Sequence, residues 1–134
     1  MSTLDSVLII EDTETDRYIV SRLVRRAWPE ARIWEAADGQ EAIELLETLG
    51  DVGPELIFLD INMPRMNGHE FLERYYARLE RQAPVVLMLT SSDSPEDRER
   101  VSRFACVRDY LVKPISREQV EALPGLPGEM TRAA

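Results

Sequence analysis

Polar side chains stand at the points where four apolar runs of this sequence stop. These polar residues are Glu11, Asp12, Asp60, Thr90 and Lys113, and Lys113 is the only lysine of the chain. If the runs are parallel strands, their carboxyl ends lie along one edge of a sheet, the edge at which open α/β folds bind ligands. Three carboxylates, one hydroxyl and one ammonium group would then share a pocket. An unpaired cluster of this kind is costly, so its presence indicates chemistry.

The three carboxylates need a cation or a bound proton. Two like charges about 4 Å apart repel by roughly 1 kcal/mol in water and by about 4 kcal/mol at an effective dielectric constant of 20. Hard oxygen ligands suit Mg²⁺, which we therefore expect as the cofactor. Beside the metal, Asp60 can attack a phosphoryl group and form an acyl phosphate. Lys113 is a compact cation for the phosphoryl oxygens, and Thr90 can donate a hydrogen bond to them.

Composition limits the classes of function that fit the chain. Its 134 residues suit one domain, and its 44% hydrophobic content suits a globular protein. A formal net charge of -9 argues against a role at the phosphate backbone of DNA or RNA. The single cysteine, Cys106, excludes an internal disulfide. No apolar run approaches the length of a membrane span and the first residues are no signal peptide, so we expect a cytoplasmic protein with no membrane association.

Strand-like and helix-like patterns alternate along the chain. Short apolar runs predict strands over residues 6–11, 32–35, 55–60, 84–90 and 108–112. Amphipathic patterns predict one helix that starts near Thr13 and three helices over residues 39–49, 95–104 and 116–123. A further predicted helix carries Phe71, Leu72, Tyr75 and Leu79. His69 stands at the start of the helix that carries Phe71. It has no visible partner, so we expect it at the surface.

Five strand–helix units with short loops predict an α/β fold. We expect a doubly wound, five-stranded parallel sheet with helices on both faces. The flavodoxin-like strand order 2-1-3-4-5 would place the first and third strands side by side. Glu11, Asp12 and Asp60 would then meet at the carboxyl edge of the sheet.

The chain resembles a response-regulator receiver domain of two-component signalling, in particular the stand-alone chemotaxis type. Four motifs carry the resemblance in the expected order, and together they are very specific. They are Glu11-Asp12, the stretch from Asp60 to Gly68, Leu89-Thr90-Ser91, and the stretch from Tyr110 to Pro114. The resemblance implies a receiver domain over residues 1–125, followed by a short tail over residues 126–134 and no output domain.

The resemblance also implies roles for individual residues around the metal. Asp60 would be the phosphoacceptor, and Asp12 and Asp60 would bind Mg²⁺ directly. Glu11 would act on the metal through water, and the backbone carbonyl of Asn62 would complete the protein ligands. Glu11 stands where aspartate is commoner in the family, which could tune the affinity for the metal.

Further roles concern the phosphoryl group and the signal. The resemblance implies that Thr90 and Lys113 contact the phosphoryl group and that Lys113-Pro114 is a cis peptide. Thr90 and Tyr110 would form the conformational switch. The small polar residues Asn62 and Ser92 would leave an attacking water room to reach the phosphoryl group.

We therefore expect a single-domain response regulator. It would accept a phosphoryl group from a histidine kinase or a histidine phosphotransfer protein, and catalyse only its own phosphorylation and dephosphorylation. The signal would leave through a protein contact, or the chain would act as a phosphate sink. The charged stretch over residues 95–108, with Arg100 and Arg103, would dock a partner or a second copy of the chain. Otherwise the docking face would lie on the first helix near Asp16 and Ile19.

Three alternatives can be weighed from the residues. A haloacid-dehalogenase-like phosphatase would place Asp-x-Asp after its first strand, whereas this chain has Asp60-Ile61-Asn62 after the third. A flavodoxin-type FMN binder would need a Ser/Thr/Gly cradle where this chain has the acidic residues 11–16. A binding module with the receiver fold that works without phosphorylation is the third alternative, and the intact acidic set argues against it.

Overall fold

The protein forms a five-stranded parallel sheet in the order β2-β1-β3-β4-β5, as predicted. The structure is a computed structural model, and it describes residues 4–82, 84–91 and 95–122. The strands are β1 (Ser6–Ile10), β2 (Arg32–Ala36), β3 (Leu56–Asp60), β4 (Val85–Thr90) and β5 (Val107–Val112). The helices are α1 (Glu14–Ala27), α2 (Gly39–Leu49), α3 (Gly68–Gln82), α4 (Pro95–Ser102) and α5 (Arg117–Glu121), with a 3₁₀ turn η1 (Gly50–Val52).

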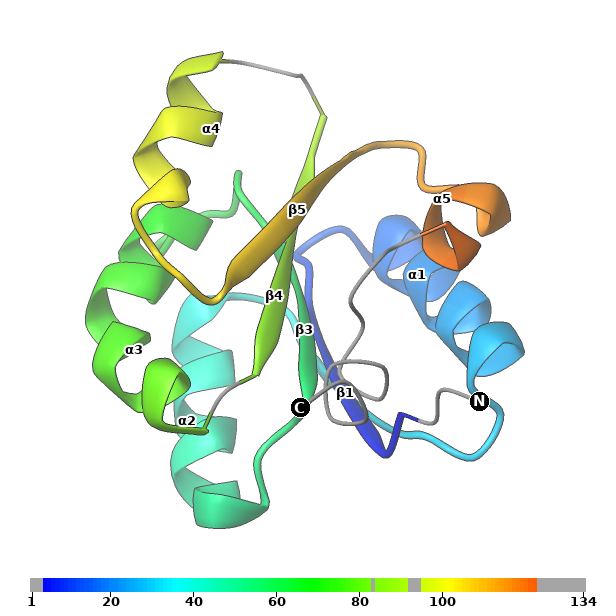
Figure 1. Cartoon of the computed structure of the whole chain (residues 1–134), viewed down its shortest axis with the longest axis horizontal. Coiled ribbons are helices and arrows are strands. Elements are labelled where there is room, and N and C mark those ends of the chain that lie inside the picture. The colour runs from blue at the N-terminus through cyan, green and yellow to red at the C-terminus, as the bar shows by residue number, and fades with distance from the viewer. Residues whose placement is uncertain (1–3, 83, 92–94, 123–134) are drawn as a thin grey trace.

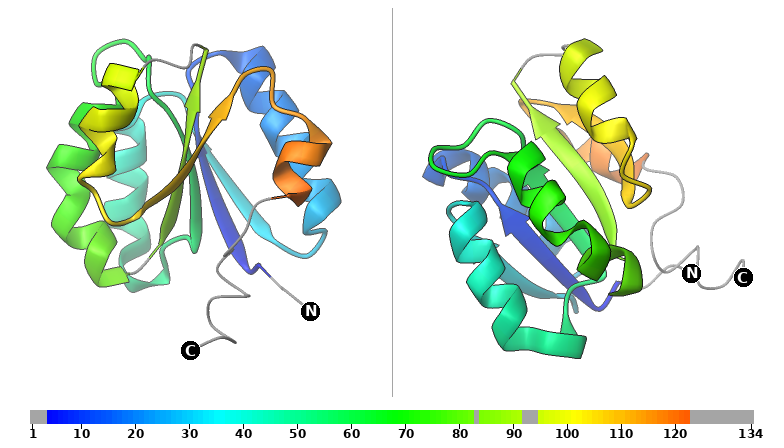
Figure 2. Two further views of the ribbon diagram at one scale, coloured as in Figure 1. Left: turned by 45° about the horizontal axis from the view of Figure 1, so that its top comes forward. Right: turned by 90° about the vertical axis from the view of Figure 1, so that its left-hand side faces the viewer.

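Helices cover both faces of the sheet, which confirms the doubly wound arrangement (Figures 1 and 2). Helices α1 and α5 lie on one face, and α2, α3 and α4 lie on the other. Successive strand residues point to opposite faces, so Leu8 and Ile10 join one apolar cluster and Val7 and Ile9 join the other. Strands β1, β3 and β4 are buried along their whole length, which explains their unbroken apolar sequences.

The element bounds differ from the predicted ones mainly near the carboxyl terminus. Helix α4 stops at Ser102 rather than at residue 104, and β5 starts one residue early at Val107. Helix α5 is only Arg117–Glu121, and Ser116 caps it by accepting from the backbone N–H of Gln119. The expected last residue of this helix and the expected tail lie outside the described residues. Within the described ranges, no helix is long and apolar enough to cross a membrane.

The prediction that His69 lies at the surface was wrong. His69 is only 3% exposed, because α4 packs beside the start of α3 and brings Asp97 to within 4.0 Å of its Nε2 atom. Burial lowers the pKa of His69, and the charge of Arg100 lowers it further. Cys106 is also buried, and it lies in one of the two apolar clusters.

Candidate functional site

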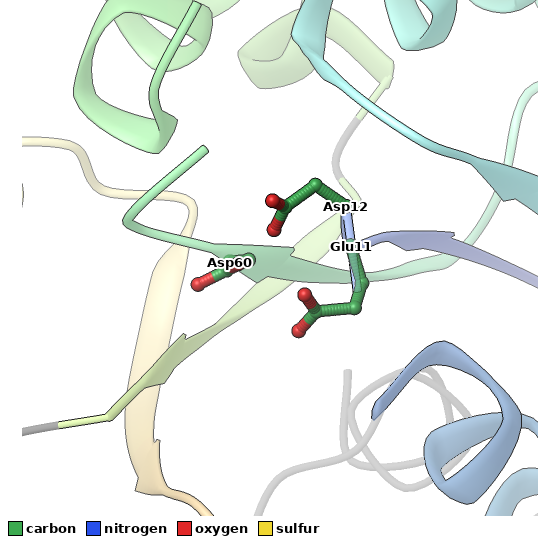
Figure 3. A group of neighbouring side chains, drawn as sticks. All are labelled: Glu11, Asp12 and Asp60. Atoms are coloured by element: carbon green, nitrogen blue, oxygen red, sulfur yellow. The ribbon is translucent and has the colours of Figure 1, made fainter. Parts of the chain in front are cut away.

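The carboxyl ends of β1 and β3 bring three carboxylates together. The pairing of Ile10 with Leu59 places the residues that follow them, Glu11 and Asp60, next to each other. One carboxylate oxygen each from Glu11, Asp12 and Asp60 lies within 4.8 Å of the other two. Figure 3 shows the three side chains at this edge, with Glu11 and Asp12 extending toward Asp60. The sequence prediction of a shared acidic pocket thus corresponds to a cluster in the structure.

The acidic cluster combines buried and exposed groups. Glu11 is fully buried and Asp60 is 3% exposed, whereas Asp12 lies in contact with solvent. Burial raises the pKa of Asp60 to about 8, with the charge of Glu11 as the next cause, and Lys113 opposes the rise. A negative charge on Asp60 is therefore unfavourable until a cation reaches it.

Lys113 supplies one cation to the site from the end of β5. Its ammonium nitrogen lies 2.5 Å from Oε1 of Glu11 and 3.5 Å from Oδ2 of Asp60. A third carboxylate, Asp16 of α1, lies 3.2 Å away through its Oδ2 atom. Burial by itself lowers the pKa of Lys113, but its carboxylate partners raise it above the ordinary value, so the side chain stays charged. The Lys113–Pro114 peptide bond is cis.

Backbone contacts fix Glu11 in the pocket. Its Oε2 atom accepts from the backbone N–H of Thr13 at 3.0 Å, and its own N–H donates to the carbonyl of Ala36 at 3.0 Å. Its carbonyl accepts from Nη1 of Arg17 at 2.8 Å. The glutamate is thereby held between β1, β2 and the start of α1, with its second oxygen free to face Lys113.

The loop after β3 folds tightly around Asp60. The N–H of Asn62 donates to Oδ1 of Asp60 at 3.2 Å, and the N–H of Gly68 donates to the carbonyl of Ile61 at 2.9 Å. A Cβ atom on Gly68 would lie 2.8 Å from the backbone oxygen of Asp60, so only glycine fits there. Asn62 itself is exposed beside the acidic cluster.

A second contact holds this loop from outside. Arg65 has a positive φ of 65° and pairs with Asp38, which accepts from the N–H of Glu41 at the start of α2. Burial would raise the pKa of Asp38, but the N–H of Glu41 and the charge of Arg65 hold it below its ordinary value. The loop that carries Asn62 is therefore anchored to α2.

Thr90 ends β4 beside this pocket and is 3% exposed. Its carbonyl accepts from the N–H of Lys113 at 2.8 Å, so the two residues are neighbours across the β4–β5 edge. Ser92, for which the sequence predicts a role in dephosphorylation, lies outside the described residues.

Tyr110 stands on β5 with its ring directed to α4. Its hydroxyl donates to the carbonyl of Arg98 at 2.8 Å, and the Arg98 guanidinium lies 4.6 Å from the ring centre. Burial raises the pKa of Tyr110 above the ordinary value. The ring is partly buried and packs against the core on the side of α2, α3 and α4.

The sequence placed Asp16 only on an alternative docking face, and it did not predict the contacts of Asp16, Arg17 and Arg98 with the residues of the site. Asp16 lies in the first turn of α1, directly after the acidic residues that follow β1, and this closeness in sequence was the only signal that it could reach the same pocket. The contact of Arg98 with Tyr110 depends on how α4 packs, for which the sequence contains no local pattern.

The donor set suits a hard cation. Carboxylate oxygens from Glu11, Asp12 and Asp60 are the ligands that Mg²⁺ uses, and the exposed Asp12 leaves the cluster open on one side. The pKa of Asp60 stays well above its ordinary value, which indicates that Lys113 balances only part of the negative charge of the cluster. The residues present therefore fit a divalent metal ion.

Comparisons with known proteins identify the family of the chain. The model of the response regulator receiver domain matches residues 7–123. The two-component response regulator ORR3 of Oryza sativa is 33% identical over 118 residues, which cover 87% of this chain and 86% of that protein.

Solved structures show the same fold. A two-component response regulator from Cytophaga hutchinsonii has a TM-score of 0.81 and 27% identity, covering 90% of this chain and 94% of that one. The chemotaxis protein CheY4 of Vibrio cholerae has a TM-score of 0.76 and 26% identity, covering 98% of this chain and all of that one.

Proposed function

The chain belongs to the family of response regulator receiver domains, and we propose that Asp60 is the residue through which it is phosphorylated. The donor would be a phosphohistidine of a sensor kinase or of a phosphotransfer protein. The observation that carries the proposal is the buried carboxylate of Asp60 with Lys113 3.5 Å away and two further carboxylates beside it. We assign the receiver domain to residues 1–125, of which the family match covers residues 7–123.

Glu11, Asp12 and Asp60, with the carbonyl of Asn62, would hold Mg²⁺. When bound, the ion neutralises charge on the carboxylates and on the phosphoryl oxygens. Asp12 and Asp60 are the direct ligands in this proposal. Glu11 would act on the ion through water, because both of its oxygens already contact Thr13 and Lys113.

Phosphoryl transfer forms one bond and breaks another at phosphorus. An oxygen of Asp60 attacks the phosphorus, the phosphorus–nitrogen bond of the donor imidazole breaks, and the imidazole nitrogen keeps the electron pair and takes up a proton. Lys113 and Thr90 stabilise the charge on the transferred group by hydrogen bonds. Attack of water on the acyl phosphate then restores Asp60 and releases inorganic phosphate. In this proposal, the residue types at Asn62 and Ser92 are small enough to admit that water.

Thr90 and Tyr110 would pass the change to the surface. When Thr90 turns toward the phosphoryl group, Tyr110 leaves its contact with Arg98 and moves inward, so α4 and β5 present a different face. The face includes Arg100 and Arg103, and it would dock an effector, a phosphotransfer protein or a second copy of the chain. A chain with no such effector would act as a phosphate sink.

A direct test uses a small phosphodonor. The protein is incubated with acetyl phosphate and Mg²⁺, and intact mass spectrometry measures the gain of one base-labile phosphoryl group. We expect the group on the wild type and not on Asp60→Asn, and no phosphorylation when a chelator removes the metal. An undiminished phosphoryl group on Asp60→Asn would contradict the assignment. A wild type that binds its partner without ever being phosphorylated would instead favour the phosphorylation-independent binding module.

A further inference from the structure

Three carboxylates surround the ammonium group of Lys113. The nitrogen lies 2.5 Å from Glu11, 3.2 Å from Asp16 and 3.5 Å from Asp60. An ammonium group has three N–H donors, and each can serve one acceptor. All three contacts are ion pairs, and the contact with Asp16 is also a hydrogen bond from the ammonium group. A phosphoryl oxygen that binds this lysine therefore competes with these carboxylates for its N–H donors.

The three contacts differ in how easily they can be given up. Glu11 is fully buried and has the shortest contact, so its release would leave a charge without water or partner. Asp60 is the residue that carries the phosphoryl group in the proposed function. The side chain of Asp16 is 35% exposed, so water can solvate its carboxylate as soon as Lys113 departs. Of the two carboxylates that are not modified, Asp16 is therefore the one whose contact with Lys113 costs less to lose.

Asp16 also reaches the lysine from a different part of the chain. It stands in the first turn of α1, whereas Lys113 follows β5, and the two residues are 97 positions apart. The contact joins α1 to the segment that leads into α5, and α1 and α5 pack on the same face of the sheet (Figure 2). If a phosphoryl oxygen replaced Asp16 at Lys113, this contact between α1 and the segment before α5 would be lost.

We propose that Asp16 is a positioning residue that holds one donor of Lys113 in the resting protein and yields it to the phosphoryl group. The inference rests on the proposed function of Asp60. Asp16 competes with the phosphoryl group for Lys113, so it opposes phosphorylation. Its removal leaves Lys113 with a free N–H donor on a nitrogen that lies 3.5 Å from Asp60.

The chain offers a matched control for this competition. Glu14 is the other acidic residue in the first turn of α1, where acidic side chains favour the positive end of the helix dipole. Glu14 is exposed, and the contacts of Lys113 in the described residues do not include it. Asp16→Asn and Glu14→Gln therefore remove the same charge from the same helical turn, but only the first removes a partner of Lys113.

The main measurement is the affinity for beryllium fluoride in the presence of Mg²⁺, because this anion mimics a phosphoryl group on an aspartate. An ion pair with one exposed partner contributes a few tenths to 1 kcal/mol, so we expect Asp16→Asn to bind the mimic roughly two- to five-fold more tightly than the wild type. Glu14→Gln should match the wild type. Asp16→Glu, which keeps a carboxylate near Lys113, should restore the wild-type affinity at least in part.

A second measurement needs no metal and no mimic. The NMR signal of the Lys113 ammonium group reports its partners directly, and in the metal-free protein it should shift in Asp16→Asn and stay in place in Glu14→Gln. A merely structural role of Asp16 in α1 would not move this signal.

The outcomes separate the inference from the function on which it rests. If the wild type binds the mimic and Asp16→Asn binds it with equal affinity, Asp16 does not compete with the phosphoryl group for Lys113. The inference is then wrong, and the proposed function of Asp60 stands. If Glu14→Gln gains as much affinity as Asp16→Asn, the effect is one of overall charge and the inference is also wrong. If the wild type binds no mimic and accepts no phosphoryl group, the proposed function fails and takes the inference with it.

Discussion

The ammonium nitrogen of Lys113 lies 2.5 Å from Oε1 of Glu11, closer than it lies to the phosphoacceptor candidate Asp60. Glu11 is fully buried, and the extra methylene of glutamate relative to aspartate extends its reach toward the lysine. The resting charge of Lys113 is thus balanced chiefly by a residue that is not itself modified. The pair holds β1 and the end of β5 together across the pocket.

Loss of Lys113 should destabilise the metal-free protein. Lys113→Met leaves the buried carboxylate of Glu11 without its cation, so we expect the free energy of unfolding to fall by about 3 kcal/mol. Urea denaturation followed by circular dichroism measures this change. The double variant Glu11→Met/Lys113→Met removes both charges and should be more stable than Lys113→Met alone. A double variant that is less stable than the single one would show that Glu11 tolerates the loss of Lys113.

The metal-free protein should lose stability as the pH rises. Asp60 has a pKa of about 8 in the folded protein because it is buried beside Glu11, whereas an unfolded aspartate titrates near 3.9. The folded state thus binds the extra proton between about pH 4 and pH 8. The contribution of Asp60 to stability is therefore most favourable below this window. It falls through the window because Asp60 is ionised in the unfolded state while the folded state must keep its proton, and it levels off above about pH 8.

Asp60→Asn tests that pH dependence. The amide does not ionise, so the variant should be more stable than the wild type at pH 8 and should show a flatter dependence of the unfolding free energy on pH. Each unit of pKa shift corresponds to about 1.4 kcal/mol, so the gain should exceed 1 kcal/mol. Denaturation at a series of pH values in a chelating buffer gives both curves. Parallel curves for the two proteins would show that Asp60 ionises normally.

Gly68 should tolerate no side chain. A Cβ atom there would lie 2.8 Å from the backbone oxygen of Asp60 and 3.0 Å from the Cα atom of Ile61, and neither backbone atom can rotate away. We expect Gly68→Ala to lower the unfolding free energy by about 1–3 kcal/mol and to slow phosphorylation, because the loop after Asp60 must shift. Arg74→Ala, at an exposed position of the same helix, should change stability by less than about 0.5 kcal/mol. Equal effects of the two substitutions would contradict the steric argument.

The fold could be predicted because local and long-range signals agree in this chain. The three central strands are buried on both faces, so their sequences are unbroken apolar runs, and the short loops between elements leave few topologies. The meeting of Glu11, Asp12 and Asp60 follows from that topology alone, because parallel strands end at one edge.

Other features depend on how helices pack, which no local pattern encodes. His69 is buried because α4 packs beside the start of α3, although its neighbours in the sequence suggest a surface position. The reach of Asp16 to Lys113 depends on the rotation of α1 about its axis. The direction of the Tyr110 ring likewise depends on where the carbonyl of Arg98 lies.

Arg98 should hold Tyr110 in its resting direction. The guanidinium lies 4.6 Å from the ring centre, and such a contact at a partly exposed site contributes about 0.5–1 kcal/mol. Arg98→Ala removes this contact but keeps the backbone carbonyl that accepts from the Tyr110 hydroxyl. The population of the inward ring in the unphosphorylated protein should therefore rise by roughly two- to five-fold. The exchange broadening and chemical shifts of the Tyr110 ring in NMR spectra report that population.

The control for this prediction changes the hydroxyl instead of the guanidinium. Tyr110→Phe loses the hydrogen bond to the carbonyl of Arg98 but keeps the ring under the guanidinium. A net hydrogen bond contributes about 0.5–1.5 kcal/mol, so this variant should also favour the inward ring, and the double variant should favour it more than either change alone. Ring signals that stay unchanged in Arg98→Ala would show that the hydroxyl alone directs Tyr110 toward α4.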